Sequence, residues 1–452
     1  MTEKDRLQEL GNAPVGRLLW KYSLPAIVGM VVMSIYNVID RIFIGQGVGP
    51  EAIAGLAITF PVMNISAAFG VLVGAGAGAR TSIVLGQDNR ELAERILGNS
   101  FVMTLLFGTF YIAMLGIFID PILKAFGADE VTLPYAREFM VYMLPGLLFN
   151  NITFSYNNVM RATGYPTQAM ISMFIGAGLN LVLAPIAIFG LKLGIKGAAI
   201  ATDISMFISM CFVLHHFLNP RSVIHFKRGT FSLSWRVLAP VLAIGAAPCI
   251  VNTAGCVINA IVNNTLKTEG GPMSVGAMGI FVTFTQLLVT FVLGVCMGMQ
   301  PIVGYNYGAR KFDRLKRTYW MAVAVATAVC ALGTLVAEFA PYYIARPFTA
   351  DAQLIDESIR ALRLTTWMFW GVGFQIVSTN FFQSIGRAGK SIFMSLSRQV
   401  IFMLPLLLVM PPMIGLNGVW LSFPISDFFA NVFAAFLIAG EFRRISRLTP
   451  TA

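Results

Sequence analysis

The stretch Ser23-Leu-Pro-Ala-Ile-Val-Gly-Met-Val-Val-Met-Ser-Ile-Tyr-Asn-Val-Ile-Asp-Arg-Ile-Phe-Ile-Gly45 is apolar over the length of a bilayer and contains one acid, Asp40. About twenty apolar residues cross the hydrocarbon core of a membrane, so we expect a spanning helix here. Asp40 follows Tyr36 by one helical turn and shares its face. Pro25 removes a backbone donor early in the helix and permits a bend. An ionisable side chain inside a membrane usually has a function, and this helix is therefore a candidate for a switch operated by a proton or an ion.

The composition of the whole chain is that of a polytopic membrane protein. It has 452 residues, of which 57% are hydrophobic and only 12% charged, whereas soluble domains have about 25% charged residues. The net charge of +11 is explained by basic loops on one side of a bilayer, and we expect no nucleic-acid partner. All five cysteines fall in apolar segments and form no CxxC. We therefore expect no disulfide framework, no metal site and no cofactor.

Glycine, proline and charged breaks divide the apolar sequence into candidate spans. They predict an all-α membrane protein with twelve transmembrane helices, at residues 18–44, 52–85, 91–118, 132–158, 167–189, 195–218, 236–264, 272–305, 315–341, 355–384, 391–411 and 416–440. The polar N-terminus has no small-residue cleavage site, so the first helix is expected to remain in the protein. The glycine-rich runs 70–78 and 294–298 suit close helix contact.

Charge distribution predicts the orientation of the chain in the plasma membrane. An even number of spans places both termini on one side. Most of the 32 lysines and arginines fall in the N-terminus, in the loops that follow even-numbered spans, and in the C-terminus. Under the positive-inside rule, both termini are expected in the cytoplasm.

The two halves of the chain repeat at an offset of 222 residues. The matching positions are turn residues and loop motifs: Gly49-Pro50 with Gly271-Pro272, Gly76 with Gly298, Phe126-Gly-Ala-Asp129 with Phe348-Thr-Ala-Asp351, and Asn158 with Asn380. Six spans per repeat give the halves parallel topology. We expect an N-terminal lobe at 1–218, a cytoplasmic linker at 219–235 and a C-terminal lobe at 236–452. Two such lobes predict a V-shaped central cleft with alternating access, and a monomer would be sufficient.

Enzymatic and ATP-driven functions lack their motifs. The chain contains no GxSxG, no HExxH and no P-loop. The histidines His215, His216 and His225 lie at or beyond the cytoplasmic end of the sixth span, where an interfacial position explains them. The membrane-embedded acids remain as candidates for chemistry.

Three acids and one arginine lie inside predicted spans. Asp40 is a candidate coupling residue, although it could also lie at the headgroup level beside Arg41. Asp203, two turns inside the sixth span, suits proton exchange, or alternatively forms hydrogen bonds that only tie helices together. Arg398 and Asp427 lie on adjacent predicted helices and suggest a structural ion pair, because an isolated arginine in lipid is costly.

Polar uncharged residues within the spans are candidates for a substrate cavity or for hydrogen bonds between helices. The cavity candidates are Tyr36, Asn37, Asn157, Thr202, Asn259, Gln286 and Gln375. The chain also has 23 methionines and 36 phenylalanines, which suit an adaptable apolar cavity.

The chain resembles the multidrug and toxic compound extrusion (MATE) transporters. The likeness covers essentially the whole chain and rests on Leu24-Pro25 with Gly29, Tyr36-Asn-Val-Ile-Asp40, Phe43-Ile-Gly45, Gly49-Pro50, Ala54-Gly-Leu-Ala57 with Pro61, the two Phe-x-Ala-Asp pieces, Arg161-Ala-Thr-Gly164 and Gly194-Ile-Lys-Gly-Ala-Ala-Ile-Ala-Thr202. The resemblance implies export of lipophilic cations in exchange for protons or sodium ions, with Asp40 central to coupling.

Two departures from the family pattern affect the expected ion site. Many prokaryotic members have an acid four residues after the asparagine that matches Asn180, whereas this chain has Ala184. We hypothesise that Asp203 supplies the missing carboxylate, so that Asp40, Asn180 and Asp203 converge. Sodium-coupled members have acids on spans seven and ten, where this chain has only amides. Coupling is therefore expected in the N-terminal lobe, with H+ favoured over Na+.

The favoured function is a secondary antiporter that exports amphipathic cationic drugs. The alternative is a flippase for lipid-linked oligosaccharides from the same superfamily, for which an unpaired Arg398 facing the cleft would be the signature. An intramembrane enzyme or a receptor-like scaffold is a third, weaker reading.

Overall fold

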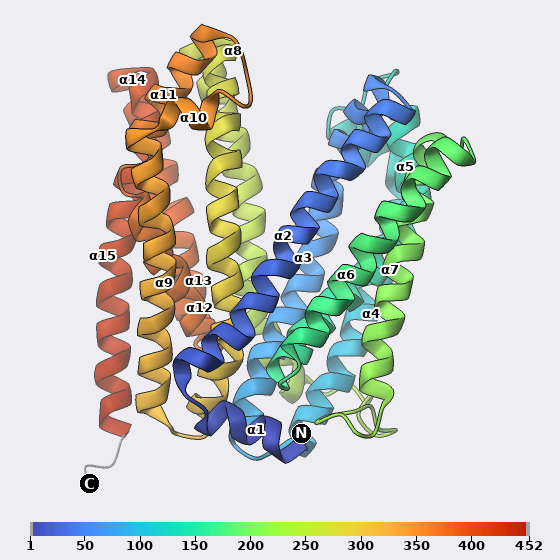
Figure 1. Cartoon of the computed structure of the whole chain (residues 1–452), viewed down its shortest axis with the longest axis vertical. Coiled ribbons are helices and arrows are strands. Elements are labelled where there is room, and N and C mark those ends of the chain that lie inside the picture. The colour runs from blue at the N-terminus through green and yellow to red at the C-terminus, as the bar shows by residue number, and fades with distance from the viewer. Residues whose placement is uncertain (1–2, 449–452) are drawn as a thin grey trace. The chain divides into compact units, whose positions relative to one another are not determined.

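The computed structural model describes residues 3–448, and every element in this range is helical (Figure 1). The helices up to residue 218 are α1 (Glu3–Asn12), α2 (Val15–Gly47), α3 (Pro50–Gly86), α4 (Arg90–Ala125), α5 (Leu133–Ala162), α6 (Pro166–Pro185), the π-helix η1 (Ile186–Gly190) and α7 (Gly194–Leu218). The remaining helices are α8 (Trp235–Gly308), α9 (Phe312–Phe339), α10 (Pro341–Ala345), α11 (Ala352–Thr366), the 3-10 helix η2 (Phe369–Gly371), α12 (Val372–Ser384), α13 (Ala388–Leu396), the π-helix η3 (Ser397–Met403), α14 (Leu404–Ile414) and α15 (Leu416–Leu448).

Nine helices among the described residues are long and apolar enough to cross a membrane. They are α2, α3, α4, α6 continued by η1, α7, α8, α9, α13 to α14, and α15. The prediction of an all-helical, multi-span membrane protein is therefore confirmed. Helix α8 covers two of the predicted spans, 236–264 and 272–305, and is interrupted between them at Gly271, where φ is 71°. Glycine adopts this conformation without the steric cost of a side chain.

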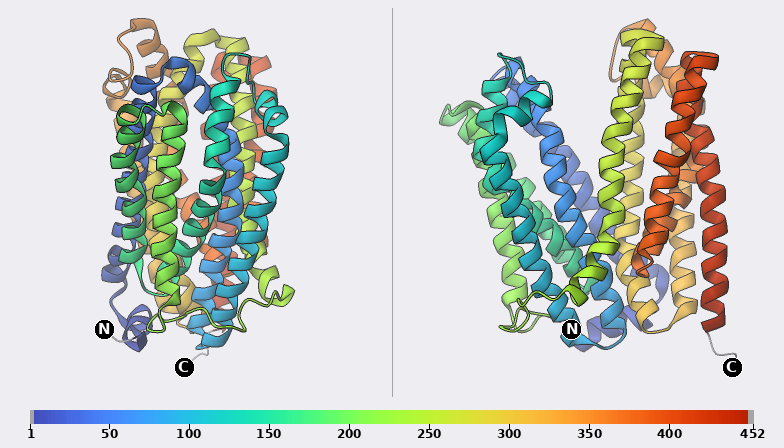
Figure 2. Two further views of the ribbon diagram at one scale, coloured as in Figure 1. Left: turned by 90° about the vertical axis from the view of Figure 1, so that its right-hand side faces the viewer. Right: turned by 180° about the vertical axis from the view of Figure 1, so that it is seen from behind.

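The chain divides into two compact units. The first holds the chain up to Ala13 together with Leu24–Cys249, and the second holds Pro14–Ser23 together with the chain from Ile250 onward. These limits differ from the predicted lobes by two short segments, the start of α2 and the start of α8. Within the first unit, α5, α6 and α7 lie side by side (Figure 2).

Small residues let α3 and α5 approach closely in the first unit, as the glycine-rich run predicted. Gly70, Gly74 and Gly78 recur every fourth residue of α3 and face α5. A Cβ atom at Gly74 would lie 2.6 Å from the Cα of Ser155. The Ser155 hydroxyl donates a hydrogen bond of 3.1 Å to the carbonyl of Gly70. Close backbone contact and interhelical hydrogen bonds replace the hydrophobic driving force that is absent between helices in lipid.

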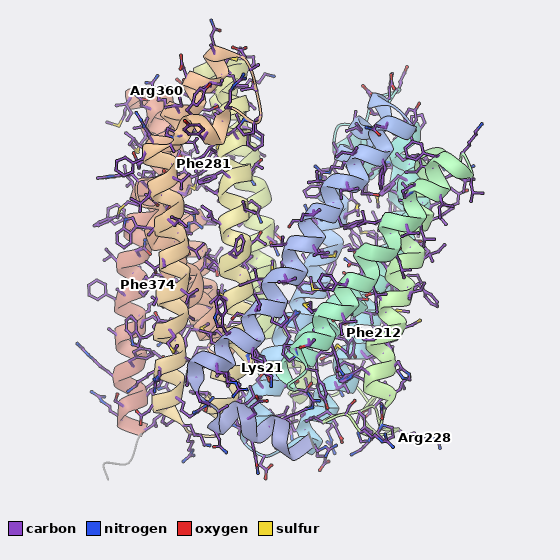
Figure 3. All side chains as sticks on the ribbon, in the orientation of Figure 1. Lys21, Phe212, Arg228, Phe281, Arg360 and Phe374 are labelled. Carbon is purple, nitrogen blue, oxygen red and sulfur yellow. The ribbon has the colours of Figure 1, made fainter. Side chains whose placement is uncertain are left out.

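The second unit has its own apolar core, formed by residues of α8, α9, α11, α14 and α15 with Ile344 and Met403. Trp420 is fully buried in this core, and the ring of Phe281 lies edge-on to that of Phe423 (Figure 3). The Tyr319 hydroxyl of α9 shares a hydrogen bond of 2.8 Å with the Ser378 hydroxyl of α12. The buried tyrosine thus has a partner for its polar end.

Candidate ion-binding site

Three polar side chains from α2, α6 and α7 form a buried hydrogen-bonded chain in the first unit. The Asn180 Nδ2 group donates to the Thr202 Oγ1 atom at 2.8 Å, and the Tyr36 side chain is hydrogen-bonded to Thr202. All three residues are at most 5% exposed. Because the Thr202 hydroxyl donates its only proton to the carbonyl of Ala198 at 2.9 Å, it accepts from both Asn180 and Tyr36.

Asp40 lies beside this chain, one turn after Tyr36 on α2, and interacts electrostatically with the tyrosine. Its Oδ1 atom is buried and has no hydrogen-bond partner among the described residues. Since the Tyr36 proton is directed to Thr202, the tyrosine and the carboxylate both present acceptor oxygens. Neighbouring acceptors without a donor between them favour the binding of a proton or a small cation.

Close contacts of α2 with α6 and η1 place Tyr36 near Asn180. A Cβ at Gly29 would lie 2.8 Å from the Sδ atom of Met173 in α6, and one at Gly47 would lie 2.2 Å from Ile188 in η1. The π-helical turn η1 directly follows Pro185, which has no N–H to continue the regular α-helical pattern. Turns of this kind are frequent at functional sites.

Asp203 faces a different neighbour from Thr202, although the two residues are consecutive. A Cβ at Gly146 of α5 would lie 2.0 Å from the Asp203 Oδ1 atom, so this carboxyl group lies directly against α5. Successive residues of a helix point about 100° apart, which explains the difference. The structure thus joins Asn180, Thr202, Tyr36 and Asp40, and it shows the Asp203 carboxyl group against Gly146.

Ala184, at the position where many family members have an acid, is fully buried. It belongs to the apolar core of the first unit, together with Ile188, Ile195 and Ala199. The hydrocarbon surroundings of this position match its alanine. A carboxylate here would need partners that these neighbours do not offer.

Other predicted cavity residues fall into two groups. Asn157 accepts a hydrogen bond of 2.7 Å from Ser172, and Gln375 donates one of 3.2 Å to the carbonyl of Met394; both are buried and join neighbouring helices. Asn37, Asn259 and Gln286 are exposed. Exposure leaves these three available to a ligand, whereas the two buried amides have partners within the protein.

Arg398 and Asp427 lie in direct contact in the second unit. The Arg398 Nε group donates to the Asp427 Oδ1 atom at 2.7 Å. The Ser426 hydroxyl donates to the Arg398 carbonyl at 2.7 Å and fixes the π-helix η3 against α15. An arginine with this partner is not the unpaired cation that the flippase alternative needs.

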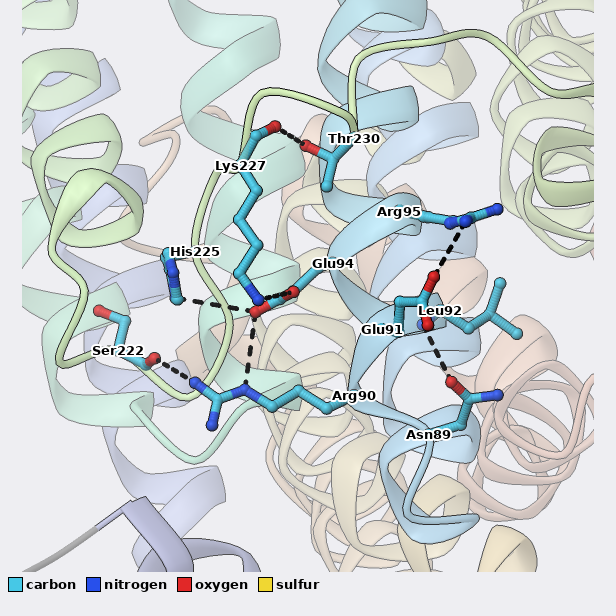
Figure 4. Close-up of polar contacts among 10 residues, drawn as sticks. All are labelled: Asn89, Arg90, Glu91, Leu92, Glu94, Arg95, Ser222, His225, Lys227 and Thr230. Atoms are coloured by element: carbon cyan, nitrogen blue, oxygen red, sulfur yellow. Dashed lines mark hydrogen bonds and ion pairs between the residues drawn. The ribbon is translucent and has the colours of Figure 1, made fainter.

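One ionic cluster was not singled out from the sequence. Glu94 of α4, whose side chain is only 3% exposed, receives Lys227 Nζ at 2.5 Å and lies 3.6 Å from Arg90 Nε and 3.7 Å from His225 Nδ1 (Figure 4). The cluster attaches the segment between α7 and α8 to α4. Glu94 and Lys227 are 133 residues apart, so no local pattern could reveal the pair. Among the described residues, no group of His, Cys, Asp and Glu is suited to hold a metal ion.

Comparisons with known proteins agree with this architecture. The MatE family model matches residues 25–186 and 243–409. The "FAD transporter" of Shewanella oneidensis MR-1 is 26% identical over 444 residues, which cover 96% of each chain. "Multidrug export protein MepA" of Staphylococcus aureus MSSA476 is 26% identical over 428 residues, covering 94% of this chain and 93% of that protein.

A solved structure has the same fold. It is described as the outward-facing conformation of a multidrug resistance MATE family transporter of the MOP superfamily, and it matches with a TM-score of 0.90 at 25% identity over 97% of this chain and 98% of that one. The family model covers more than half of the present chain. The chain therefore belongs to the MATE family and is a multi-pass membrane transporter of the MOP superfamily, not an enzyme.

Proposed function

We propose that this transporter is an antiporter that exports amphipathic organic cations in exchange for protons. It would do so by alternating access of two lobes with six spans each, twelve in total, with both termini in the cytoplasm, and as a monomer. The observation that carries the proposal is Asp40, an acid on α2 whose buried Oδ1 atom makes no hydrogen bond among the described residues. It lies beside the chain Tyr36–Thr202–Asn180.

Each residue of this site has a distinct role in the proposal. Asp40 binds the proton, and Tyr36 supplies a second acceptor oxygen. Asn180 and Thr202 orient the tyrosine hydroxyl. Asp203 assists the exchange from the adjacent position on α7, where its carboxyl group lies against Gly146. Substrate and proton compete because each favours a different state of α2, a helix that Pro25 allows to bend.

We favour protons over sodium ions because the site has one central carboxylate and hydroxyl groups that are already hydrogen-bonded. A hard cation such as sodium prefers several oxygen ligands around it. The cation preference follows from the same carboxylate, since a buried acid attracts positive charge. Arg398, the intramembrane cation that would suit an anionic substrate, already pairs with Asp427.

The test is ethidium efflux from cells that express the wild type or Asp40→Asn, with and without a proton uncoupler. Efflux that the uncoupler abolishes, and that Asp40→Asn reduces to background, is the expected result. Asp120→Asn is the matched control, because Asp120 forms an ion pair of 2.9 Å with Arg137 at an exposed position of the same unit. Exposed pairs contribute little, so this variant should transport normally.

Other outcomes of the same assay would change the proposal. Efflux that depends on a sodium gradient and ignores the uncoupler would assign coupling to sodium. Wild-type cells that retain ethidium but release FAD would move the substrate to the class named for the Shewanella relative. Absence of both activities would favour the flippase alternative.

A further inference from the structure

A polar cavity of about 190 Å³ lies in the first unit, away from the candidate ion site. It forms where α1, the turn between α5 and α6, and the end of α7 meet. The residues that line it are Arg6, Tyr165, Gln168, His216, Asn219, Arg221 and Ser222. The lining includes two arginines and a histidine but no aspartate or glutamate, so its charge balance favours an anion.

The surrounding structure holds the arginine of α1 in place. The Arg6 guanidinium lies 4.5 Å from the centroid of the Tyr165 ring, and one of its nitrogens lies 3.5 Å from the Gly164 carbonyl. These contacts orient the planar group and leave most of its N–H donors available. Such a group is suited to a phosphoryl oxygen.

Two buried polar atoms at the cavity have no hydrogen-bond partner among the described residues, His216 Nε2 and Gln168 Oε1. The histidine ring is held edge-on against Tyr165, with centroids 4.5 Å apart, and its backbone carbonyl accepts a bond of 2.5 Å from the Ser222 hydroxyl. Buried polar atoms in native proteins normally have partners. A ligand that carries both acceptor oxygens and a hydroxyl donor would supply partners to both atoms.

The start of α6 adds to the positive potential. Tyr165, the residue before this helix of 20 residues, makes no capping hydrogen bond with its side chain. The first N–H groups of the helix have no partner within the helix, and its dipole favours negative charge at this end. Gln168 belongs to this first turn.

We propose that this cavity binds the phosphoryl group of a hydroxyl-bearing phosphate ester. Arg6 and Arg221 contact the phosphoryl oxygens, and Gln168 accepts a hydrogen bond from the hydroxyl group. A soluble phosphate ester and the phosphoglycerol headgroup of a lipid share this chemistry. The site is independent of the transport proposal, because it shares no residue with Asp40 and its neighbours.

The experiment uses the full-length protein, purified in a phosphate-free buffer and a sugar-based detergent. Glycerol 3-phosphate is titrated and followed by thermal unfolding, and phosphatidylglycerol binding is followed by native mass spectrometry with phosphatidylcholine as the reference lipid. Binding of both phosphate probes identifies a general phosphate-ester site, whereas binding of phosphatidylglycerol alone identifies a headgroup site.

Arg221→Gln is the main variant, since Arg221 is exposed on the segment after α7 and its loss should not affect folding. We expect binding to weaken about tenfold or more, as for the loss of a charge-assisted hydrogen bond. Arg6→Gln should act in the same direction. The matched control is Arg228→Gln, an exposed arginine of the same segment that does not line the cavity (Figure 3).

Two results would overturn the proposal. One is a wild type that binds neither probe, which would leave a cavity for water alone. The other is equal binding by Arg221→Gln and Arg228→Gln, which would reduce the effect to general surface charge.

Discussion

At the scale of single residues, the candidate ion site depends on which hydroxyl donates to which oxygen. Thr202 gives its proton to the Ala198 carbonyl and therefore accepts from Tyr36 and Asn180. The tyrosine oxygen and Asp40 are consequently both acceptors. This polarity distinguishes the group from an ordinary tie between helices, in which each donor has an acceptor.

Tyr36→Phe tests the role of this hydroxyl. We expect uncoupler-sensitive efflux to fall strongly, because the second acceptor of the site is lost, while stability falls by about 1 kcal/mol. The measurements are efflux and thermal unfolding of the same preparation. Tyr111→Phe is the matched control, since the Tyr111 hydroxyl is also buried and donates to the Val62 carbonyl at 2.6 Å. Equal effects of the two variants on efflux would reduce Tyr36 to a structural residue.

The ion pair in the second unit predicts an asymmetry between breaking the pair and replacing it. Arg398→Gln leaves Asp427 buried without its cation and should destabilise the protein by about 3–5 kcal/mol. Arg398→Met combined with Asp427→Leu removes both charges and should cost much less. Thermal unfolding of the single and double variants measures the difference. A double variant as unstable as the single one would show that the contact of 2.7 Å contributes net stability.

Asp129 gives a pH dependence outside the membrane spans. Its carboxylate accepts hydrogen bonds from the Thr132 hydroxyl at 2.7 Å, the Thr132 N–H at 2.8 Å and the Val131 N–H at 3.1 Å. The Thr132 hydroxyl first, and then the backbone donors, hold the pKa of Asp129 below its usual range. A lowered pKa in the folded state stabilises the turn at pH values above the unfolded value of about 3.9, and this contribution is lost as the pH falls below it.

The expected result is faster hydrogen exchange at the amides of Val131 and Thr132 in acid, after correction for the intrinsic rates. Asp129→Asn should show the faster exchange already at neutral pH. Protection that stays constant from neutral pH down to about 3 would contradict the assignment.

At the scale of elements, the contact between α3 and α5 depends on the absence of side chains at three positions. Gly74→Ala should destabilise the first unit by about 1–3 kcal/mol, because its Cβ would lie 2.6 Å from the Cα of Ser155. Gly116→Ala on α4 is the control, since no other atom lies within 4 Å of the added Cβ. Alanine at an open helix position should be neutral or stabilising. Thermal unfolding of the two variants should shift in different directions, and equal losses would contradict a steric contact.

The connections between helices also follow the repeat. Asp129 accepts from backbone groups just before α5, and Asp351, its partner in the repeat, accepts from the Gln353 N–H at 2.9 Å at the start of α11. In both places a carboxylate satisfies donors where a helix begins, as N-capping requires. The Phe-x-Ala-Asp motif is therefore a helix-start device used twice.

At the scale of the whole molecule, the repeat relates two close contacts. A Cβ at Gly76 would lie 1.9 Å from the Val241 carbonyl and 3.1 Å from the Gly245 nitrogen, and one at Gly298 would lie 2.6 Å from the Ser23 nitrogen. Gly298 lies 222 residues after Gly76, and Gly245 lies 222 residues after Ser23. The first contact belongs to the first unit and the second to the second unit. Each unit thus uses its repeated glycine to hold a short segment from α8 or from α2.

Gly76→Val and Gly298→Val should therefore both destabilise the protein, each by about 1–3 kcal/mol or more because of overpacking against backbone atoms. Gly279→Val on α8, where no other atom lies within 4 Å of an added Cβ, is the control. Thermal unfolding of the three variants measures the effect. A loss at only one of the two repeated positions would show that the contacts are not equivalent.

Much of this protein follows from the sequence by itself. The apolar spans, their breaks, the repeat and the close contact at Gly70–Gly78 depend on residues near one another in the chain, and bilayer thickness and helix geometry constrain them tightly. The sequence also identifies Asp40, because an acid in an apolar run is conspicuous.

Only the tertiary structure decides which of these side chains meet. Thr202 and Asp203 are consecutive, yet one contacts Asn180 and the other lies against Gly146. The phosphate cavity unites residues from Arg6 to Ser222. Helix rotation and packing between distant segments set these contacts, and no local pattern encodes either of them.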